Sequence, residues 1–151
     1  MRLLVDTSAY SAFMRGYGEI KAALQEADEI FVNLIVLGEL RAGFIKGRRR
    51  RKNDDELNTF LASPRVKLLD VTEETAERYA VILNSLWQAG TPIPTNDIWI
   101  AASAMEHGLE LLTTDGHYQK VPQVIVNCFR VSIETLNNSP NKSCVDRQFK
   151  R

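Results

Sequence analysis

The chain has 151 residues, of which 44% are hydrophobic and 25% are charged. These proportions exclude a fibrous or generally disordered protein and fit one globular domain that buries its own core. Nineteen basic and nineteen acidic residues give a net charge of zero, so a surface that binds nucleic acid would have to be local.

No apolar stretch approaches the roughly 20 residues that cross a bilayer. The N-terminus also lacks the basic and apolar regions of a secretory signal, so we expect a cytoplasmic protein with no membrane partner. The two cysteines, Cys128 and Cys144, show no metal-ligand spacing and are interpreted as reduced thiols.

Short apolar runs alternate with segments of helical periodicity along the chain. The runs predict strands at residues 3–5, 29–33, 66–70, 109–114 and 124–126. The periodicity predicts helices at residues 9–15, 19–27, 34–45, 54–61, 72–88 and 95–107. This alternation favours an α/β fold with a mainly parallel sheet.

Two segments allow more specific expectations. The helix at 72–88 should face the core through Ala76, Tyr79, Ala80, Leu83 and Trp87, and Trp99 should also serve the core. From residue 137 to 151 the chain is rich in Asn, Ser, Pro and charge, which predicts a disordered tail after a domain that spans residues 1–136.

Four acids stand out by their positions. Asp6 and Asp115 follow predicted strands, and Asp97 stands at a helix start, where any one of them alone fits a helix cap. Glu39 lies inside an apolar helix, where a carboxylate is costly unless it is paired or binds metal. Because the first and fourth strands of a doubly wound sheet end on one rim, Asp6 and Asp115 are expected to be neighbours.

Such neighbours create a repulsion problem. Two carboxylates about 4 Å apart repel by roughly 4 kcal/mol at an effective dielectric near 20. Protons or cations must offset this repulsion. A set of carboxylates and hydroxyls without clustered His or Cys favours Mg²⁺ or Mn²⁺ over Zn²⁺.

Four motifs in this order resemble those of PIN-domain ribonucleases, specifically the VapC-type toxins of type II toxin-antitoxin systems. The resemblance extends from Met1 to about Ile133. The motifs are Leu4-Val5-Asp6-Thr7-Ser8, Leu37-Gly38-Glu39-Leu40 with Gly43, Asn96-Asp97-Ile98-Trp99-Ile100-Ala101-Ala102, and Leu112-Thr113-Thr114-Asp115.

The resemblance implies a PIN-like three-layer fold, with a five-stranded sheet flanked by helices. It implies that Asp6, Glu39, Asp97 and Asp115 are catalytic and hold one or two Mg²⁺ or Mn²⁺ ions, with which the protein hydrolyses RNA phosphodiester bonds through metal-activated water. It further implies a cognate antitoxin as partner, and a homodimer.

Hydroxyls and one histidine surround these acids in the sequence. Thr7 and Thr113 are candidate supporting hydroxyls, whereas Ser8 is expected to make a local turn bond. Many PIN proteins carry a further acid two residues after the fourth, where this chain has His117. A second metal is therefore in question. His117 is interpreted as an exposed loop residue without a role in the site, and the alternative is that it contacts substrate or a metal-bound water.

Six of the seven residues from Lys46 to Lys52 are basic, and this run is the local candidate for phosphate contact. The alternatives are a solvated loop and a surface for an acidic antitoxin. The candidate contacts are Arg48, Arg49, Arg50 and Arg51.

Two other functions compete with the metal-dependent ribonuclease. One is a degenerate PIN module that binds RNA or protein without cleavage, against which the presence of all four acids argues. The other is a phosphatase that forms an aspartyl phosphate, but its second Asp, two positions after the first, is Ser8 here.

Overall fold

The computed structural model describes residues 1–130, which contain one five-stranded sheet. The strands are β1 (Arg2–Val5), β2 (Glu29–Asn33), β3 (Val66–Leu69), β4 (Glu110–Thr113) and β5 (Val126–Cys128). Their order is β3-β2-β1-β4-β5, and every neighbouring pair is parallel. The predicted α/β fold is confirmed, with a sheet that is parallel throughout the described residues.

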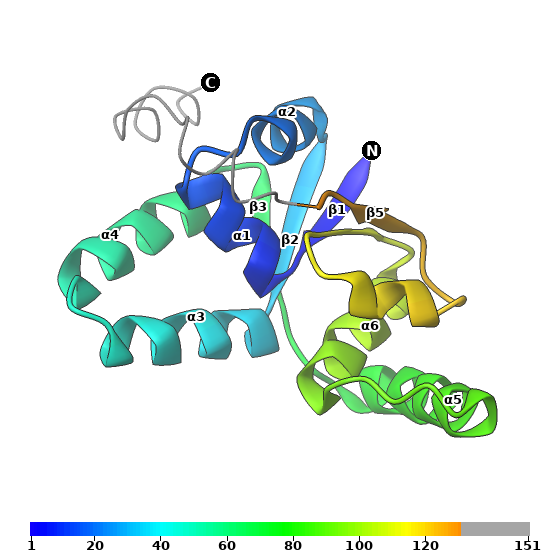
Figure 1. The fold of residues 1–151 in the computed structure, drawn as a ribbon. Helices are drawn as coiled ribbons and strands as arrows, with labels where there is room; N and C mark the ends of the chain where they lie inside the picture. The colour runs from blue at the N-terminus through cyan, green and yellow to red at the C-terminus, as the bar shows by residue number, and fades with distance from the viewer. Residues whose placement is uncertain (131–151) are drawn as a thin grey trace.

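Helices cover the sheet on both faces, which makes the predicted three layers (Figure 1). They are α1 (Thr7–Met14), α2 (Gly18–Glu26), α3 (Leu34–Lys46), α4 (Arg50–Leu61), α5 (Glu73–Ala89), α6 (Thr95–His107) and the short 3-10 helix η1 (Gly116–Lys120). Figure 1 shows α1 and α2 on the opposite side of the sheet from α5 and α6, while α3 and α4 extend sideways as a pair.

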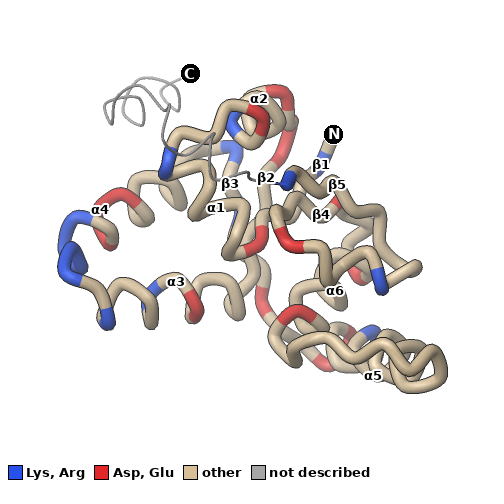
Figure 2. The backbone as a smooth tube through the Cα atoms, viewed as in Figure 1, with Lys and Arg blue, Asp and Glu red and all other residues tan. Residues whose placement is uncertain are grey.

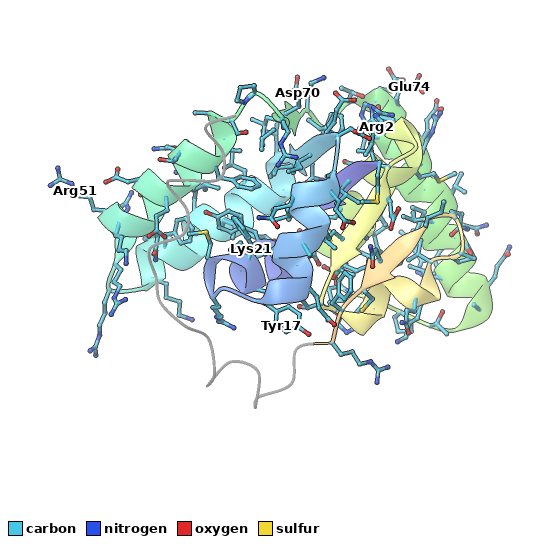
Figure 3. All side chains as sticks on the ribbon, turned by 90° about the horizontal axis from the view of Figure 1, so that it is seen from above. Arg2, Tyr17, Lys21, Arg51, Asp70 and Glu74 are labelled. Atoms are coloured by element: carbon cyan, nitrogen blue, oxygen red, sulfur yellow. The ribbon has the colours of Figure 1, made fainter. Side chains whose placement is uncertain are left out.

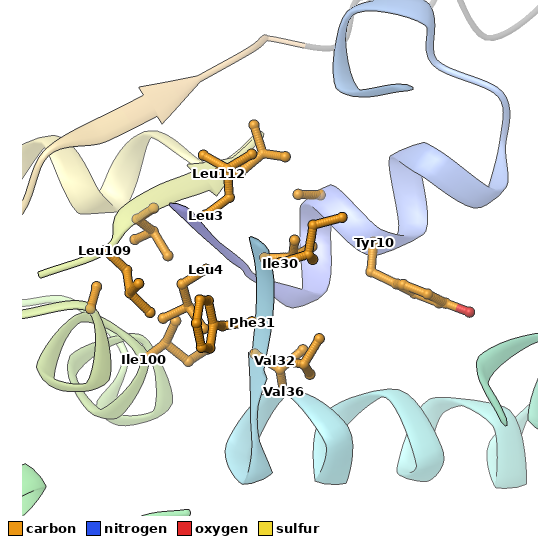
Figure 4. Packing of buried hydrophobic residues seen from close by; sticks show 14 of the residues in the cluster. Leu3, Leu4, Tyr10, Ile30, Phe31, Val32, Val36, Ile100, Leu109 and Leu112 are labelled. Atoms are coloured by element: carbon orange, nitrogen blue, oxygen red, sulfur yellow. The ribbon is translucent and has the colours of Figure 1, made fainter. Parts of the chain in front are cut away.

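Alternate side chains of the strands supply the two halves of the core. Leu4 and Phe31 are register partners and lie on the α6 side with Ile100 (Figure 4). Ile30 points to the other side, toward the helix that carries Tyr10. Such strands are buried on both faces, which is why they read as continuous apolar runs.

The strand order places the candidate acids. The chain runs from β1 outward to β2 and β3, and then crosses to β4 on the other side of β1. The carboxyl ends of β1 and β4 therefore flank the point where the direction of winding reverses, and ligands of open α/β sheets bind in the crevice there. Asp6 directly follows β1, and its N–H donates to the Leu112 carbonyl on β4 over 3.2 Å.

Helix α4 begins four residues before its predicted start. The first turn carries basic residues, which the helix dipole disfavours. These basic residues form ion pairs with acids one turn later: Arg50 pairs with Asp54 at 3.6 Å, and Lys52 pairs with Glu56 at 3.8 Å. Such i,i+4 pairs and the good helix propensity of Arg and Lys extend the helix through the basic run.

The predicted core side of α5 is wrong for three of its five residues. Trp87 is 70% exposed, and Ala76 and Ala80 are also exposed, whereas Tyr79 and Leu83 pack against the core. The buried positions of α5 are Thr75, Ile82 and Leu86. In the sequence, two neighbouring faces of this helix are about equally apolar. Packing against α6 decides which of the two faces is buried.

Two smaller corrections concern aromatic packing and the last strand. Trp99 is partly buried and stacks on Tyr79, with ring centroids 4.1 Å apart, at the α5–α6 contact rather than in the fully buried core. Strand β5 lies two residues after its predicted position. Cys128 is a free thiol, as expected.

Some predictions cannot be compared with the structure. The predicted tail at residues 137–151, including Cys144, and the domain boundary at residue 136 lie outside the described residues. Within residues 1–130, no helix is both long enough and apolar enough to cross a membrane.

Candidate active site

Asp6 is a helix cap and a member of a buried polar network at the same time. Its Oδ1 accepts from the Ala9 N–H at 2.8 Å, which caps α1, and its Oδ2 accepts from Thr113 Oγ1 at 2.6 Å. Ser8 Oγ donates to the same carboxylate at 2.8 Å. Asp6 can therefore cap α1 and be a candidate site residue at the same time.

Ser8 makes the expected local bond and also joins the two strand ends. Besides donating to Asp6, its Oγ accepts from the Thr114 N–H at 3.0 Å. Thr113 Oγ1 in turn accepts from the Asp115 N–H at 2.9 Å. The β1 and β4 ends are therefore linked through hydroxyls, which hold Asp6 and Asp115 in fixed relation.

Asp97, Asp115 and His117 form a compact group of ligand-type atoms. One oxygen from each acid and one ring nitrogen of the histidine all lie within 4.8 Å of one another. His117 Nδ1 is 3.2 Å from Asp97 Oδ2 and 3.1 Å from Asp115 Oδ1. The expectation that no histidine clusters with the acids is therefore wrong, because η1 turns His117 back toward α6.

Tyr118 contacts one of the candidate acids, which the sequence did not reveal. Its hydroxyl donates to Asp97 Oδ1 at 3.2 Å, and the side chain is buried. Burial and the charges of Asp6, Asp97 and Glu39 raise its pKa, so the hydroxyl stays protonated and remains a donor. From the sequence, a tyrosine after a turn is expected to be a core residue. No local pattern predicts that its hydroxyl contacts Asp97.

Glu39 approaches the site from α3. It is partly buried, and its Oε1 accepts from Thr7 Oγ1 at 2.8 Å. Thr7 therefore hydrogen-bonds a carboxylate, and its supporting role in a catalytic site stays a prediction. The compact group of Asp97, Asp115 and His117 includes neither Glu39 nor Asp6 among the described residues.

Electrostatics show that these carboxylates are crowded. Burial raises the pKa of Asp6 to about 6, against hydrogen bonds from Thr113, Ala9 and Ser8, and the charge of Asp97 raises it further. The pKa of Asp97 is also raised, first by burial and also by the charge of Asp115. Negative charge is thus disfavoured at both positions.

The donor set fits a divalent cation. Asp97 and Asp115 both form ion pairs with His117. Crowded carboxylates with raised pKa values gain stability from a cation held between them. Carboxylate oxygens are the ligands that Mg²⁺ and Mn²⁺ accept, and imidazole suits transition metals.

The basic run lies elsewhere. Arg48, Arg49, Arg50 and Arg51 are all exposed at the turn between α3 and α4 and at the start of α4. Figure 2 shows this turn in blue at the end of α3 that is remote from β2, and in Figure 3 Arg51 points away from the body of the molecule. The four arginines are not part of the acidic group.

Comparisons with known proteins agree with the fold and the motifs. A family model for the PIN domain matches residues 3–124. Ribonuclease VapC4 of Mycobacterium tuberculosis (strain ATCC 25618 / H37Rv) is 35% identical over 130 residues, which cover 83% of this chain and 95% of that relative.

Solved structures give the same result for the fold. VapBC2 from Rickettsia felis, bound to a DNA fragment from their promoter, matches with a TM-score of 0.77 at 23% identity, over 85% of this chain and 99% of that chain. VapBC-5 from Mycobacterium tuberculosis, a member of the VapBC family of toxin-antitoxin systems, matches with a TM-score of 0.67 at 25% identity, over 86% and 98%. The chain belongs to the PIN-domain family and, within it, to the VapC ribonucleases.

Proposed function

We propose that this protein is a metal-dependent endoribonuclease and the toxin of a toxin-antitoxin pair. The observation that carries the proposal is the crowding of Asp97 and Asp115 at the switch point of the sheet, beside a buried Asp6 whose pKa is raised to about 6. The relation to a protein named Ribonuclease VapC4, at 35% identity, supports the same reaction.

Asp97 and Asp115 would hold a Mg²⁺ or Mn²⁺ ion, with Asp6 and Glu39 as the neighbouring carboxylates. When bound, such an ion supplies a water of lowered pKa and positive charge for the phosphate under attack. The charges of Asp6 and Glu39 both raise the pKa of Tyr118, which supports placing these carboxylates near Asp97.

The chain's own residues hold this pocket in position. Thr113 and Ser8 donate to Asp6, Thr7 donates to Glu39, and Tyr118 donates to Asp97. Each donor fixes the orientation of a carboxylate, which is how groups around a metal centre tune it. Their hydrogen bonds also favour the charged form of Asp6 and Asp97, the form that binds a cation.

RNA and a cognate antitoxin are the partners that we propose. The solved relative VapBC-5 is described as a toxin-antitoxin system, which supports an antitoxin. The exposed arginines at the α3–α4 turn offer phosphate or antitoxin contact.

A homodimer is also proposed, and the exposed Val81 and Trp87 of α5 provide apolar surface for it. Its test is the mass measured by light scattering.

The nuclease activity is tested with purified protein and RNA in Mg²⁺ or Mn²⁺, with and without chelator. Variants Asp6→Asn and Asp97→Asn are assayed beside Asp70→Asn. Asp70 follows β3 as Asp6 follows β1, but it is exposed and two strands away from β1, so it is the matched control.

We expect cleavage by the native chain and by the Asp70 variant, and its loss in chelator and in both site variants. Cleavage that persists in chelator, or in both site variants, would contradict a metal nuclease. RNA that binds but is never cut with any metal would favour a binding module instead.

A further inference from the structure

His117 occupies a position between two carboxylates. Its Nδ1 is 3.1 Å from Asp115 Oδ1 and 3.2 Å from Asp97 Oδ2, although the two acids come from different elements. Asp97 belongs to the first turn of α6, and Asp115 caps η1. The side chain is 44% exposed, yet this one ring nitrogen lies within hydrogen-bonding distance of both oxygens.

The surrounding hydrogen bonds hold this arrangement. The His117 N–H donates to Asp115 Oδ1 at 2.9 Å, so the first turn of η1 ties the backbone of the histidine to the acid. The Tyr118 hydroxyl occupies Asp97 Oδ1, and the other oxygen of Asp97 is the one beside His117. Consecutive residues of η1 thus bind the two oxygens of one carboxylate.

The spacing of these three ligand atoms also fits a metal site. Bonds of about 2.1 Å in an octahedral site place adjacent ligand atoms about 3 Å apart. The two distances from Nδ1 match this edge length. The same distances also fit hydrogen bonds, whose direction depends on the tautomer of His117, but one N–H cannot form two good linear bonds.

We propose that His117 Nδ1 is a metal ligand together with Asp97 and Asp115, and that this nitrogen makes the site prefer Mn²⁺ to Mg²⁺. The inference rests on the proposed metal-dependent function. Mg²⁺ prefers oxygen ligands and keeps its waters, whereas imidazole nitrogen suits transition metals. A carboxylate at position 117 gives an all-oxygen site and removes this preference.

The chain contains two histidines, His107 and His117, which makes a clean experiment possible. MnCl₂ and MgCl₂ are titrated calorimetrically into the native chain, His117→Asp, His117→Ala and His107→Ala. Pulsed electron paramagnetic resonance of bound Mn²⁺ then reports whether a nitrogen is bonded to the ion. His107, beside Glu106 at the end of α6, is the matched control.

We expect a bonded nitrogen in the native chain and in His107→Ala, and its loss in both His117 variants. The preference for Mn²⁺ over Mg²⁺, as a ratio of Kd values, should fall roughly 10-fold in His117→Asp, the lower end of what changes around a metal site do to its affinity. His117→Asp keeps a ligand at the position, so loss of metal by misfolding is separated from the change in preference.

Two results would overturn the inference. A nitrogen signal that persists in His117→Ala, or a Kd ratio unchanged in His117→Asp, refutes the nitrogen ligand while the metal nuclease stands. If the native chain binds neither ion, the nitrogen ligand and the proposed metal dependence both fail.

Discussion

Two charge clusters of the described residues are built in opposite ways: the acidic group of Asp6, Glu39, Asp97 and Asp115, and the basic α3–α4 turn. The acids are buried or partly buried, are held by hydroxyls from other elements, and have raised pKa values at Asp6 and Asp97. The arginines are exposed, and Arg50 forms its ion pair with Asp54, one turn later in the same helix.

The difference indicates where function is concentrated. Burying like charges costs free energy that hydrogen bonds offset in part, so the acidic group gains stability from a proton or a bound cation. Exposed arginines cost little and contribute through screened, long-range attraction. Substitutions in the acidic group should therefore change the rate of RNA cleavage sharply. Substitutions at the basic turn should change the affinity for RNA only modestly.

The largest effect is expected for Asp97→Asn. It should lower kcat for RNA cleavage by roughly 10²- to 10³-fold, the size seen when one electrostatic catalytic group is removed. Because the pKa of Asp97 is raised, the neutral Asn should not lower metal-free stability. Cleavage assays and urea unfolding measure both quantities. A variant that is inactive because it is unfolded would contradict this account.

The second effect is a pH dependence of the metal-free protein. The pKa of Asp6 rises from 3.8 to about 6 on folding, so the folded state binds more protons between these values. The free energy of unfolding should therefore fall as pH rises from about 4 to 7, by roughly 3 kcal/mol for two pKa units.

Urea unfolding in chelator across this range checks the sign. The fall should be smaller in Asp6→Asn, and added Mn²⁺ should restore stability at pH 7. Stability that increases with pH over this window would refute the burial of an uncompensated Asp6 carboxylate.

A smaller effect is expected for Thr113→Val, which keeps the shape of the side chain. It removes the 2.6 Å hydrogen bond to Asp6 and the acceptor of the Asp115 N–H, so both acids lose orientation. Activity or metal affinity should fall roughly 10-fold. Thr59→Val, at an exposed position of α4, is the control. Equal activity of both variants would show that Thr113 does not position the site.

The smallest effect is expected at the basic turn. Replacing Arg48, Arg49 and Arg51 together by Ala should raise KM for RNA a few-fold at low salt, leave kcat unchanged, and flatten the salt dependence by roughly 0.7 per lost phosphate contact. Steady-state kinetics at several salt concentrations measure this. If antitoxin affinity falls while KM does not change, the turn is an antitoxin surface.

Much of the fold was predictable because its signals are local. The strand at 29–33 and the helix that follows it depend on a continuous apolar run and on periodicity. The start of α4 and the buried stripe of α5 were predicted wrongly. In the first case ion pairs one turn away overrode the local charge pattern, and in the second two stripes were equally apolar.

The site divides in the same way. Asp6, Asp97 and Asp115 were found as candidates because each stands at the end of a strand or the start of a helix, and parallel strands bring such ends to one rim. Their catalytic and metal-binding roles remain predictions. The contacts of His117 and Tyr118 with Asp97 were not predicted, because they span 20 and 21 residues and depend on how η1 folds back.

The sequence alone determined the alternation of elements, the acids at the carboxyl ends of β1 and β4, and the hydroxyls beside them, because these follow from periodicity and from position in a strand or helix. Tertiary structure alone decided that one nitrogen of His117 meets two carboxylates, and that Asp6 is buried enough for its pKa to reach about 6. The burial of a carboxylate and the distance between two charged groups depend on which segments pack together. No local pattern in the sequence predicts this packing.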